Sequence, residues 1–500
     1  MIIEALYHIV PPHKKPLLQG NSLFVREIGN IGYKKGVTAL MEKPADHGPS
    51  KRVALFVSTV SSFLSAFMSS SIIVALPSIA KEFSLNAILL SWIPTSQILA
   101  TAVFLVPIGR IADIHGSKRI FTYGIFTIMV ASLLSAYATS GTMLLSFRVL
   151  QGLGNAMTFS TGIAILTSIY PADQRGKVLG INVSAVYLGL SLGPFIGGIL
   201  TQQFGWRSIF LVIVPLGLLV FAAVLGKLEG EWKGAQGEKF DLIGSLIYGA
   251  AIVSLMSGFS QLPAMTGVGT IAAGIVGAWI FIRWEMRVDS PILDMNLFKK
   301  NTVFAFSNLA ALINYGATFA VAFLLSLYLQ HVKGFSPQLA GLVLVSMPVV
   351  QAVFSPLAGK LSDKIEPRLI VSAGMALTTL GLVFLEFVDQ DTAIPYILVS
   401  LVILGFGFAF FSSPNTNAIM SSVDQKFYGI ASATVATTRQ MGMMISMGIV
   451  MLIFTLHLGG TQIKPENYPA FIESLRTAFV VFTILCFGGI FASLARGKVH

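Results

Sequence analysis

The sequence predicts an all-α membrane protein with fourteen transmembrane helices. Of its 500 residues, 54% are hydrophobic and only 11% are charged, whereas soluble domains carry about 25% charged residues. Its apolar runs reach the length of about 18 residues that marks a membrane helix, and they do not alternate as the strands of a β-barrel would. A polar loop also recurs late in the chain, which indicates two related halves.

Residues 1–50 form a polar leader that lacks the basic and apolar regions of a signal peptide. Met41 begins a stretch that is typical of the polar start before a first membrane helix. We therefore expect residues 1–40 to be either a misassigned start upstream of Met41 or a dispensable, disordered cytoplasmic tail.

From Val53 onward, apolar runs follow one another at the length of roughly 20 residues that a helix needs to cross the hydrocarbon core. The predicted spans are 53–77, 88–109, 119–138, 142–168, 177–201, 207–226, 241–260, 267–284, 302–330, 337–358, 368–388, 393–418, 428–455 and 472–494. With this count, most lysines and arginines lie in alternate loops. The loops and helix ends on the opposite side of the membrane hold only five basic residues: Lys81, Arg207, Lys333, Lys464 and Arg476. This bias predicts that both termini are cytoplasmic.

The recurring loop sets the domain organisation. Gly109–Arg119 (GRIADIHGSKR) and Gly359–Arg368 (GKLSDKIEPR) both begin with glycine, a basic, an apolar and a small residue, and then aspartate. Both follow an apolar run that contains a proline, Pro107 or Pro356. The two loops end spans two and ten, so they are eight helices apart. A half of six helices followed by an inserted pair accounts for this separation.

We therefore predict four segments: the leader 1–50, a six-helix half 51–228, an inserted pair 229–300 and a second six-helix half 301–500. The net charge of +11 is explained by membrane topology, so we expect no nucleic-acid partner. The single cysteine, Cys486, lies in an apolar run. Metal-ligand spacing and phosphate-binding loops do not occur, so we expect neither an enzyme nor a bound cofactor or metal.

The motifs of this chain resemble those of the major facilitator superfamily, and in particular its fourteen-helix drug:proton antiporter branch. The resemblance covers nearly everything from residue 51 on, and the segments that carry it are Gly109–Arg119, Arg148–Gly154, Gly189–Gly198, Val74–Pro77, Gly205–Phe210 and Arg439–Gly442. It implies two pseudo-symmetric six-helix halves that move about a central cavity. It also implies a monomer in the cytoplasmic membrane that exports a small-molecule substrate and draws on the proton gradient.

The resemblance assigns the repeated loop the role of a cytoplasmic latch between the halves. The latch residues are Gly109, Asp113, Gly116, Lys118, Arg119, Gly359 and Asp363. Physically, the glycines let backbones approach, and Asp113 can face a helix N-terminus. The alternative interpretation is an ordinary basic turn.

The resemblance assigns a gate to span five. Gly189, Gly193 and Gly197 recur every four residues and form one smooth stripe that suits close helix packing. Pro194 removes one backbone hydrogen bond and can bend the helix. Generic packing is the alternative interpretation, and in the family reading this packing is itself the gate.

The resemblance also implies a central cavity. Its candidate residues are Arg148, Gln151, Asn308, Tyr315, Asn417 and Arg439. An arginine within a span usually faces the bundle interior or a water-filled cavity. A lining of aromatic, methionine and amide side chains suits large apolar molecules, and ordinary helix packing explains any single one of these residues equally well.

The chain departs from the family at Met68, where the fourteen-helix antiporters often carry aspartate. None of its acidic residues lies near the middle of a predicted span, yet proton antiport needs a group that changes charge within the membrane. Asp113 or Glu386 would have to serve. Otherwise the protein is an uncoupled or differently coupled transporter of a specific metabolite or anion. A sensor that uses the fold without transport is a third possibility.

Overall fold

The computed structural model describes residues 48–235, 237–288, 290–293, 298–299, 301–362, 364–423 and 428–497. Within these residues the chain is helical, and fourteen helices are long and apolar enough to cross a membrane. The predicted all-α membrane fold is therefore confirmed. The leader ahead of residue 48 and Asp363 lie outside the described residues.

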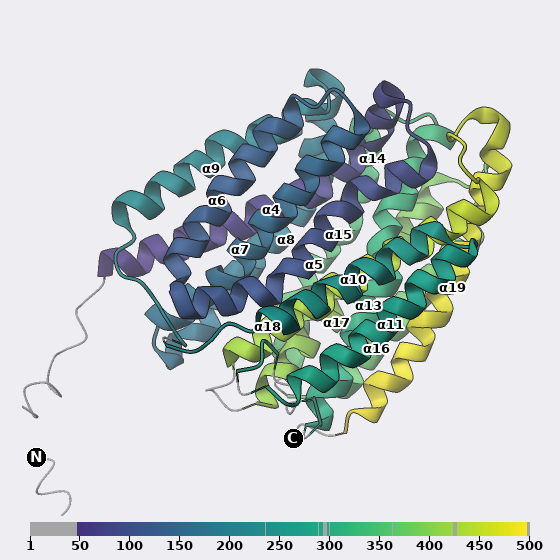
Figure 1. The fold of residues 1–500 in the computed structure, drawn as a ribbon. Helices are drawn as coiled ribbons and strands as arrows, with labels where there is room; N and C mark the ends of the chain where they lie inside the picture. Colours follow the sequence, from purple (N-terminus) through teal and green to yellow (C-terminus); the bar gives the residue numbers. More distant parts are fainter. Residues whose placement is uncertain are drawn as a thin grey trace, which may run out of the picture. The chain divides into compact units, whose positions relative to one another are not determined.

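The helices follow one another in two groups of six spans with a pair between them (Figure 1). We refer to the first group as the N-terminal half: α4 (Gly48–Phe83), α5 (Ala87–His115), α6 (Ser117–Ala136), α7 (Gly141–Ile169), α8 (Ala172–Phe204) and α9 (Arg207–Lys227). The inserted pair is α10 (Leu242–Gln261) and α11 (Met265–Glu285).

We refer to the last six spans as the C-terminal half: α13 (Thr302–Leu327) with the π-helix η1 (Tyr328–Val332), α14 (Pro337–Leu344) with α15 (Ser346–Ser362), α16 (Pro367–Glu386), α17 (Ile394–Ser421), α18 (Tyr428–His457), and the 3-10 turn η3 (Pro465–Asn467) with α19 (Tyr468–Ala495). The predicted tenth span is thus built from two consecutive helices. The segment boundaries proposed from the sequence remain a prediction.

Several helices begin at a side chain that caps the first turn. The capping residues, whose side-chain oxygens accept backbone N–H groups, are Asn86, Ser140, Asp241, Asn301 and Ser336. Such caps satisfy amide groups that the following helix leaves without partners. They place the ends of the spans at short polar loops, as the sequence pattern predicts.

The two halves repeat the same close helix contact, which supports their predicted relationship. In the N-terminal half, a Cβ added to Gly154 of α7 would lie 3.0 Å from the carbonyl oxygen of Gly124 on α6. In the C-terminal half, a Cβ added to Gly407 of α17 would lie 2.9 Å from the carbonyl oxygen of Gly374 on α16. Paired glycines therefore let corresponding helices touch backbone to backbone in both halves.

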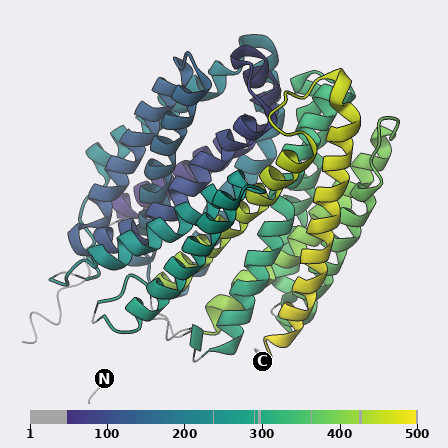
Figure 2. The ribbon, with the colours of Figure 1, turned by 45° about the vertical axis from the view of Figure 1, so that its right-hand side comes forward.

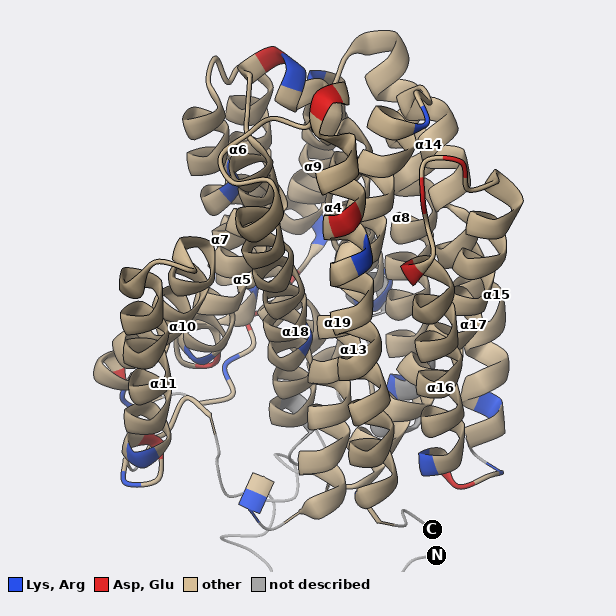
Figure 3. Cartoon of the chain, turned by 90° about the vertical axis from the view of Figure 1, so that its right-hand side faces the viewer, with Lys and Arg blue, Asp and Glu red and all other residues tan. Residues whose placement is uncertain are grey.

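Successive spans cross the bundle in alternating directions, so the loops separate into two ends. We use "basic end" for the end at which α9 ends and α10 begins, and "distal end" for the opposite one. Figure 3 shows that charged residues concentrate in loops and at helix ends and that the helix interiors are mostly free of them. This distribution matches helices surrounded by hydrocarbon.

The inserted pair lies against one helix of each half. The hydroxyl of Tyr248 on α10 donates a hydrogen bond to the carbonyl oxygen of Ala102 on α5, at 2.9 Å. A Cβ added to Gly448 of α18 would lie 3.1 Å from the ring of Phe259 on α10. Figures 1 and 2 show α10 running beside α18, and α11 packs on α10. The pair therefore covers the line along which α5 and α18 meet.

Candidate transport pathway and its gates

The predicted gate helix, α8, packs closely on α4 of its own half. The hydroxyl of Ser70 donates to the carbonyl oxygen of Gly189 at 3.2 Å, and that of Ser71 donates to the carbonyl oxygen of Gly193 at 3.0 Å. A Cβ added to Gly197 would lie 2.7 Å from the Cβ of Ser71. The glycine stripe thus creates the predicted close contact and leaves no room for larger side chains.

The same stretch of α8 also meets α14 of the other half. A Cβ added to Gly198 would lie 2.6 Å from the carbonyl oxygen of Pro337. A Cβ added to Gly341 of α14 would collide with the carbonyl oxygen of Pro194. Small residues on both helices therefore allow the halves to touch beside the proline. The sequence pattern identified the stripe on α8, but no local pattern singled out Gly341 as its partner.

At the distal end the two halves are joined by direct hydrogen bonds within the described residues. They run from Ser326 Oγ to Ile73 O at 2.9 Å, from Gln330 Nε2 to Val74 O at 2.9 Å, from Gln462 Nε2 to Ser84 O at 2.8 Å and from Ala87 N to Thr461 O at 3.2 Å. Together with the contact between α8 and α14, they close the distal end in this structure.

A second link between the halves lies nearer the middle of the helices. The hydroxyl groups of Tyr187 on α8 and Ser412 on α17 are 2.9 Å apart and share a hydrogen bond. On α17, Phe411 directly precedes Ser412 and packs edge-on against the ring of Tyr315 on α13, with ring centres 6.5 Å apart. The guanidinium carbon of Arg439 lies 5.1 Å from the centre of the Tyr315 ring, within the range of a cation–π interaction. We refer to Tyr187, Tyr315, Ser412 and Arg439 as the central cluster.

Buried polar atoms without a hydrogen-bond partner among the described residues occur on the C-terminal helices. They include Asn314 Oδ1 and Nδ2, Gln351 Nε2, Ser355 Oγ and Arg439 Nε. Asn314 is fully buried and precedes Tyr315 of the central cluster. An unsatisfied buried polar group costs about 1–3 kcal/mol, so these groups are available to bind water or a substrate. Sequence reasoning named Arg439 but missed Asn314, Gln351 and Ser355, because a single polar residue in an apolar run resembles ordinary packing.

Arg148 holds the helices of the N-terminal half together. It is 1% exposed. Its Nε donates to the carbonyl oxygen of Ile93 at 3.2 Å, and its guanidinium donates to Gln151 Oε1 at 2.8 Å. Gln151 in turn donates to the hydroxyl of Ser132 at 3.0 Å. Arg148 thus faces the bundle interior and, through Gln151, connects α7 with α5 and α6.

The two asparagines predicted for the cavity lie between helices of the C-terminal half. Asn308 Oδ1 accepts a hydrogen bond from the hydroxyl of Thr438 at 3.3 Å, which joins α13 to α18. Asn417 Nδ2 donates to the hydroxyl of Ser362 at 3.1 Å, which joins α17 to α15. Both contacts lie toward the basic end and tie neighbouring helices to each other.

The two loops of the predicted latch begin with equivalent helix contacts. A Cβ added to Gly109 would lie 3.6 Å from the Cβ of Ser160 on α7, and one added to Gly359 would lie 2.8 Å from the hydroxyl of Ser413 on α17. Each glycine therefore faces the corresponding helix of its half. Asp363, the counterpart of Asp113, lies outside the described residues.

Segment 228–241, between α9 and α10, covers the first latch loop. Gly116 has φ +123°, a conformation that favours glycine. The contacts are Ala235 N to Asp113 O at 3.0 Å, Ser117 N to Trp232 O at 2.9 Å, Lys118 N to Glu231 Oε1 at 2.7 Å, and ion pairs of Arg119 with Glu231 at 3.8 Å and of Arg110 with Glu238. Sequence reasoning missed this covering segment, because only its charge was conspicuous.

The acidic residues considered for proton coupling lie at the helix ends. Met68, at the position where the family often has aspartate, is fully buried in α4. Asp113 lies in the last turn of α5 at the basic end, and Glu386 is the last residue of α16 at the distal end. Among the described residues, no group of three His, Cys, Asp or Glu side chains could hold a metal ion.

Two six-helix halves with paired glycine contacts, a glycine- and proline-bearing helix at their interface and a central cluster between them form an architecture typical of a membrane transporter. Residues 58–281 and 308–498 match the model of the Major Facilitator Superfamily, and the chain belongs to this family. The predicted resemblance is confirmed.

The chain is 28% identical over 443 residues to riboflavin transporter RibZ of Clostridioides difficile, covering 88% of this chain and 96% of the relative. It is 30% identical to multidrug resistance protein Stp of Mycobacterium tuberculosis (78% and 73% covered) and 31% identical to cephamycin export protein CmcT of Amycolatopsis lactamdurans (86% and 90%). In fold it is similar to a bacterial homologue of the human lysosomal transporter Spinster in an inward-facing, occupied conformation, with TM-score 0.60, 17% identity, and 90% and 97% coverage.

Proposed function

We propose that this transporter exports amphipathic small molecules, including cationic ones, across the cytoplasmic membrane in exchange for protons. We further propose that it acts as a monomer, with both termini and the basic end in the cytoplasm, because positive loops are retained there. Relatives named for multidrug resistance and cephamycin export support the export of amphipathic compounds. The observation that carries the proposal is the central cluster, in which Tyr187 on α8 of one half shares a hydrogen bond with Ser412 on α17 of the other.

The contacts between the halves support alternating access. Opening the distal end would break its four hydrogen bonds and separate α8 from α14. Each such bond contributes about 1 kcal/mol net, so a substrate or proton that favours one state by a few kcal/mol can reverse the balance. In this cycle the latch loop and segment 228–241 would control the basic end. Asp113 or Glu386 would carry the proton.

A second candidate is transport of one specific metabolite or anion without proton coupling. Arg439 supplies a positive charge to the central cluster, and its Nε has no hydrogen-bond partner among the described residues. Met68 supplies no charge. One relative is named as a riboflavin transporter. This favours a planar, polar substrate, which would stack on Tyr315 and bind Arg439.

Transport in proteoliposomes tests both candidates. The purified protein is reconstituted with ethidium or riboflavin, and flux is measured with and without an imposed pH gradient. Proton-dependent ethidium flux supports the first proposal, and riboflavin flux that ignores the gradient supports the second. Absence of flux for every amphipathic compound tried would contradict both.

Substitution of Arg439 identifies the substrate site in the same assay. Arg439→Gln removes the charge and the cation–π contact, so flux of a substrate bound at the central cluster should fall at least about tenfold. Arg283→Gln is the matched control, because Arg283 lies 5.7 Å from the Trp279 ring of the inserted pair, away from the central cluster. Equal effects of the two substitutions would contradict the assignment.

A further inference from the structure

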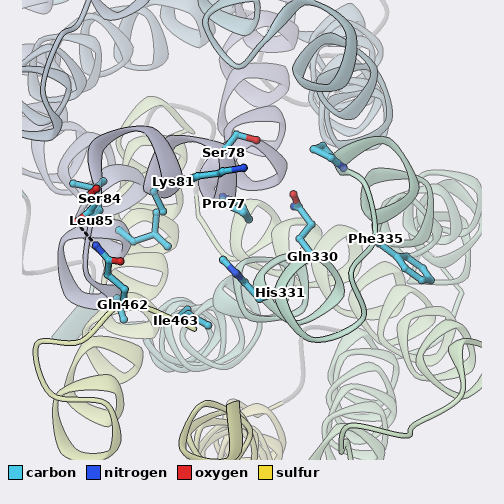
Figure 4. Close-up of a pocket in the computed structure, with 14 residues that line it drawn as sticks. Pro77, Ser78, Lys81, Ser84, Leu85, Gln330, His331, Phe335, Gln462 and Ile463 are labelled. Atoms are coloured by element: carbon cyan, nitrogen blue, oxygen red, sulfur yellow. Dashed lines mark hydrogen bonds between the residues drawn. The ribbon is translucent and has the colours of Figure 1, made fainter. Parts of the chain in front are cut away.

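A pocket of about 490 Å³ opens at the distal end between the two halves. The end of α4 and the start of α5 line one side, and η1, the start of α14 and the loop before α19 line the other (Figure 4). Its volume lies within the range of about 300–1,000 Å³ that is usual for small-molecule sites. The pocket is separate from the central cluster, and none of the latch or gate-motif residues lines it.

The polar lining of this distal pocket is basic and neutral. Lys81 and His331 line the pocket together with amide and hydroxyl side chains. No Asp or Glu belongs to the lining. Figure 4 shows Lys81, Gln330 and His331 turned toward the same space. Lys81 is exposed and has no ion-pair partner among the described residues, and His331 Nε2 is buried there without a hydrogen-bond partner.

The acidic neighbour of Lys81 is occupied elsewhere. The Glu82 carboxylate accepts hydrogen bonds from Trp206 Nε1 at 2.7 Å and from Arg207 at 2.6 Å. It therefore forms a bidentate contact with the start of α9, and Lys81 keeps its charge free for a ligand.

Apolar side chains complete the pocket. They include Pro77, Leu85, Leu90, Phe335 and Ile463. An occupant would thus meet a cationic group, neutral polar side chains and an apolar wall within one site. This combination suits a molecule with a carboxylate at one end and an aromatic or aliphatic body at the other.

We propose that the distal pocket binds an amphipathic organic anion, with an aromatic carboxylate as its simplest example, and that the bound anion holds the distal end closed. The second part rests on the proposed alternating access. Residues of both halves line the pocket, and the hydrogen bonds from Gln330 to Val74 and from Gln462 to Ser84 border it. Separation of the halves would divide the site. A ligand that needs both walls therefore stabilises the closed state.

Binding of 2-naphthoate to the purified protein tests the proposal, with 2-naphthylmethanol as the uncharged control ligand. We expect saturable binding of the carboxylate that is weaker by about tenfold in Lys81→Gln and restored in Lys81→Arg. Lys464→Gln is the matched control variant, since Lys464 lies at the same end but does not line the pocket. Bound 2-naphthoate should also slow maleimide labelling of Ser326→Cys, whose side chain is buried when the distal end is closed.

Absence of saturable binding would overturn the proposal. So would equal affinity for the alcohol, equal weakening by Lys81→Gln and Lys464→Gln, or binding that is lost in Arg439→Gln but kept in Lys81→Gln. Faster or unchanged labelling with ligand bound would overturn the conformational part. Because binding is measured without flux, its failure leaves the proposed transport function standing, and failure of transport leaves the binding result standing.

Discussion

The contact between α8 and α14 makes a direct prediction about the conformational equilibrium. Gly341→Val places a branched side chain where even a Cβ collides with the backbone oxygen of Pro194. Overpacking of this kind costs about 1–3 kcal/mol, which corresponds to a shift of roughly 5- to 150-fold between two states. The halves separate when the distal end opens, so the cost falls only on the closed state. The variant should therefore favour the open distal end.

Labelling of a buried position measures this shift. Ser326 is fully buried and donates to Ile73 across the distal end at 2.9 Å, so Ser326→Cys reports on opening with little change in size. The natural Cys486 is also fully buried. A membrane-impermeant maleimide applied from the distal side should label the reporter faster, by the factor given above, when Gly341→Val is added.

Gly488→Val provides the control, because nothing lies within 4 Å of a Cβ added at Gly488. It carries the same change in helix propensity without the collision at Pro194. Circular dichroism checks that both variants are folded. Equal labelling rates in the Gly341→Val and Gly488→Val proteins would refute the argument that the contact between α8 and α14 closes the distal end.

Three further predictions follow from other contacts. Gly193→Leu should lower stability by about 1–3 kcal/mol in thermal unfolding and abolish flux. Gly180→Leu on the same helix, where an added Cβ meets nothing within 4 Å, should retain both stability and flux. Similar losses in the two variants would contradict the packing argument. Gly116→Ala should cost more stability than Gly205→Ala, because both glycines have a positive φ but only a Cβ at position 116 meets Glu231. The additional cost should appear as faster proteolysis in segment 228–241. Identical proteolysis of the two variants would exclude the covering role of this segment. Tyr187→Phe removes the bond to Ser412 and should change the substrate concentration for half-maximal flux; an unchanged value would remove Tyr187 from the pathway.

Local properties of the chain determined its fold class. A span is recognised by its own length and hydrophobicity, because the hydrocarbon core imposes the same requirement on every helix. The repeated loop at Gly109 and Gly359 likewise indicated two related halves, and their glycines occupy equivalent helix contacts. The stripe from Gly189 to Gly197 also indicated close packing, because a period of four residues places these glycines on one face of the helix.

Only the tertiary structure decided which surfaces these elements meet. Gly341, Tyr187 and Ser412 carry no pattern of their own, and their roles come from contacts between residues more than a hundred positions apart. The inserted pair is evident as two extra spans, but its place against α5 and α18 depends on Tyr248 and Gly448. Hydrophobicity sets whether a segment enters the membrane. The fit of small and polar side chains across helices sets its neighbours, and that fit depends on both partners at once.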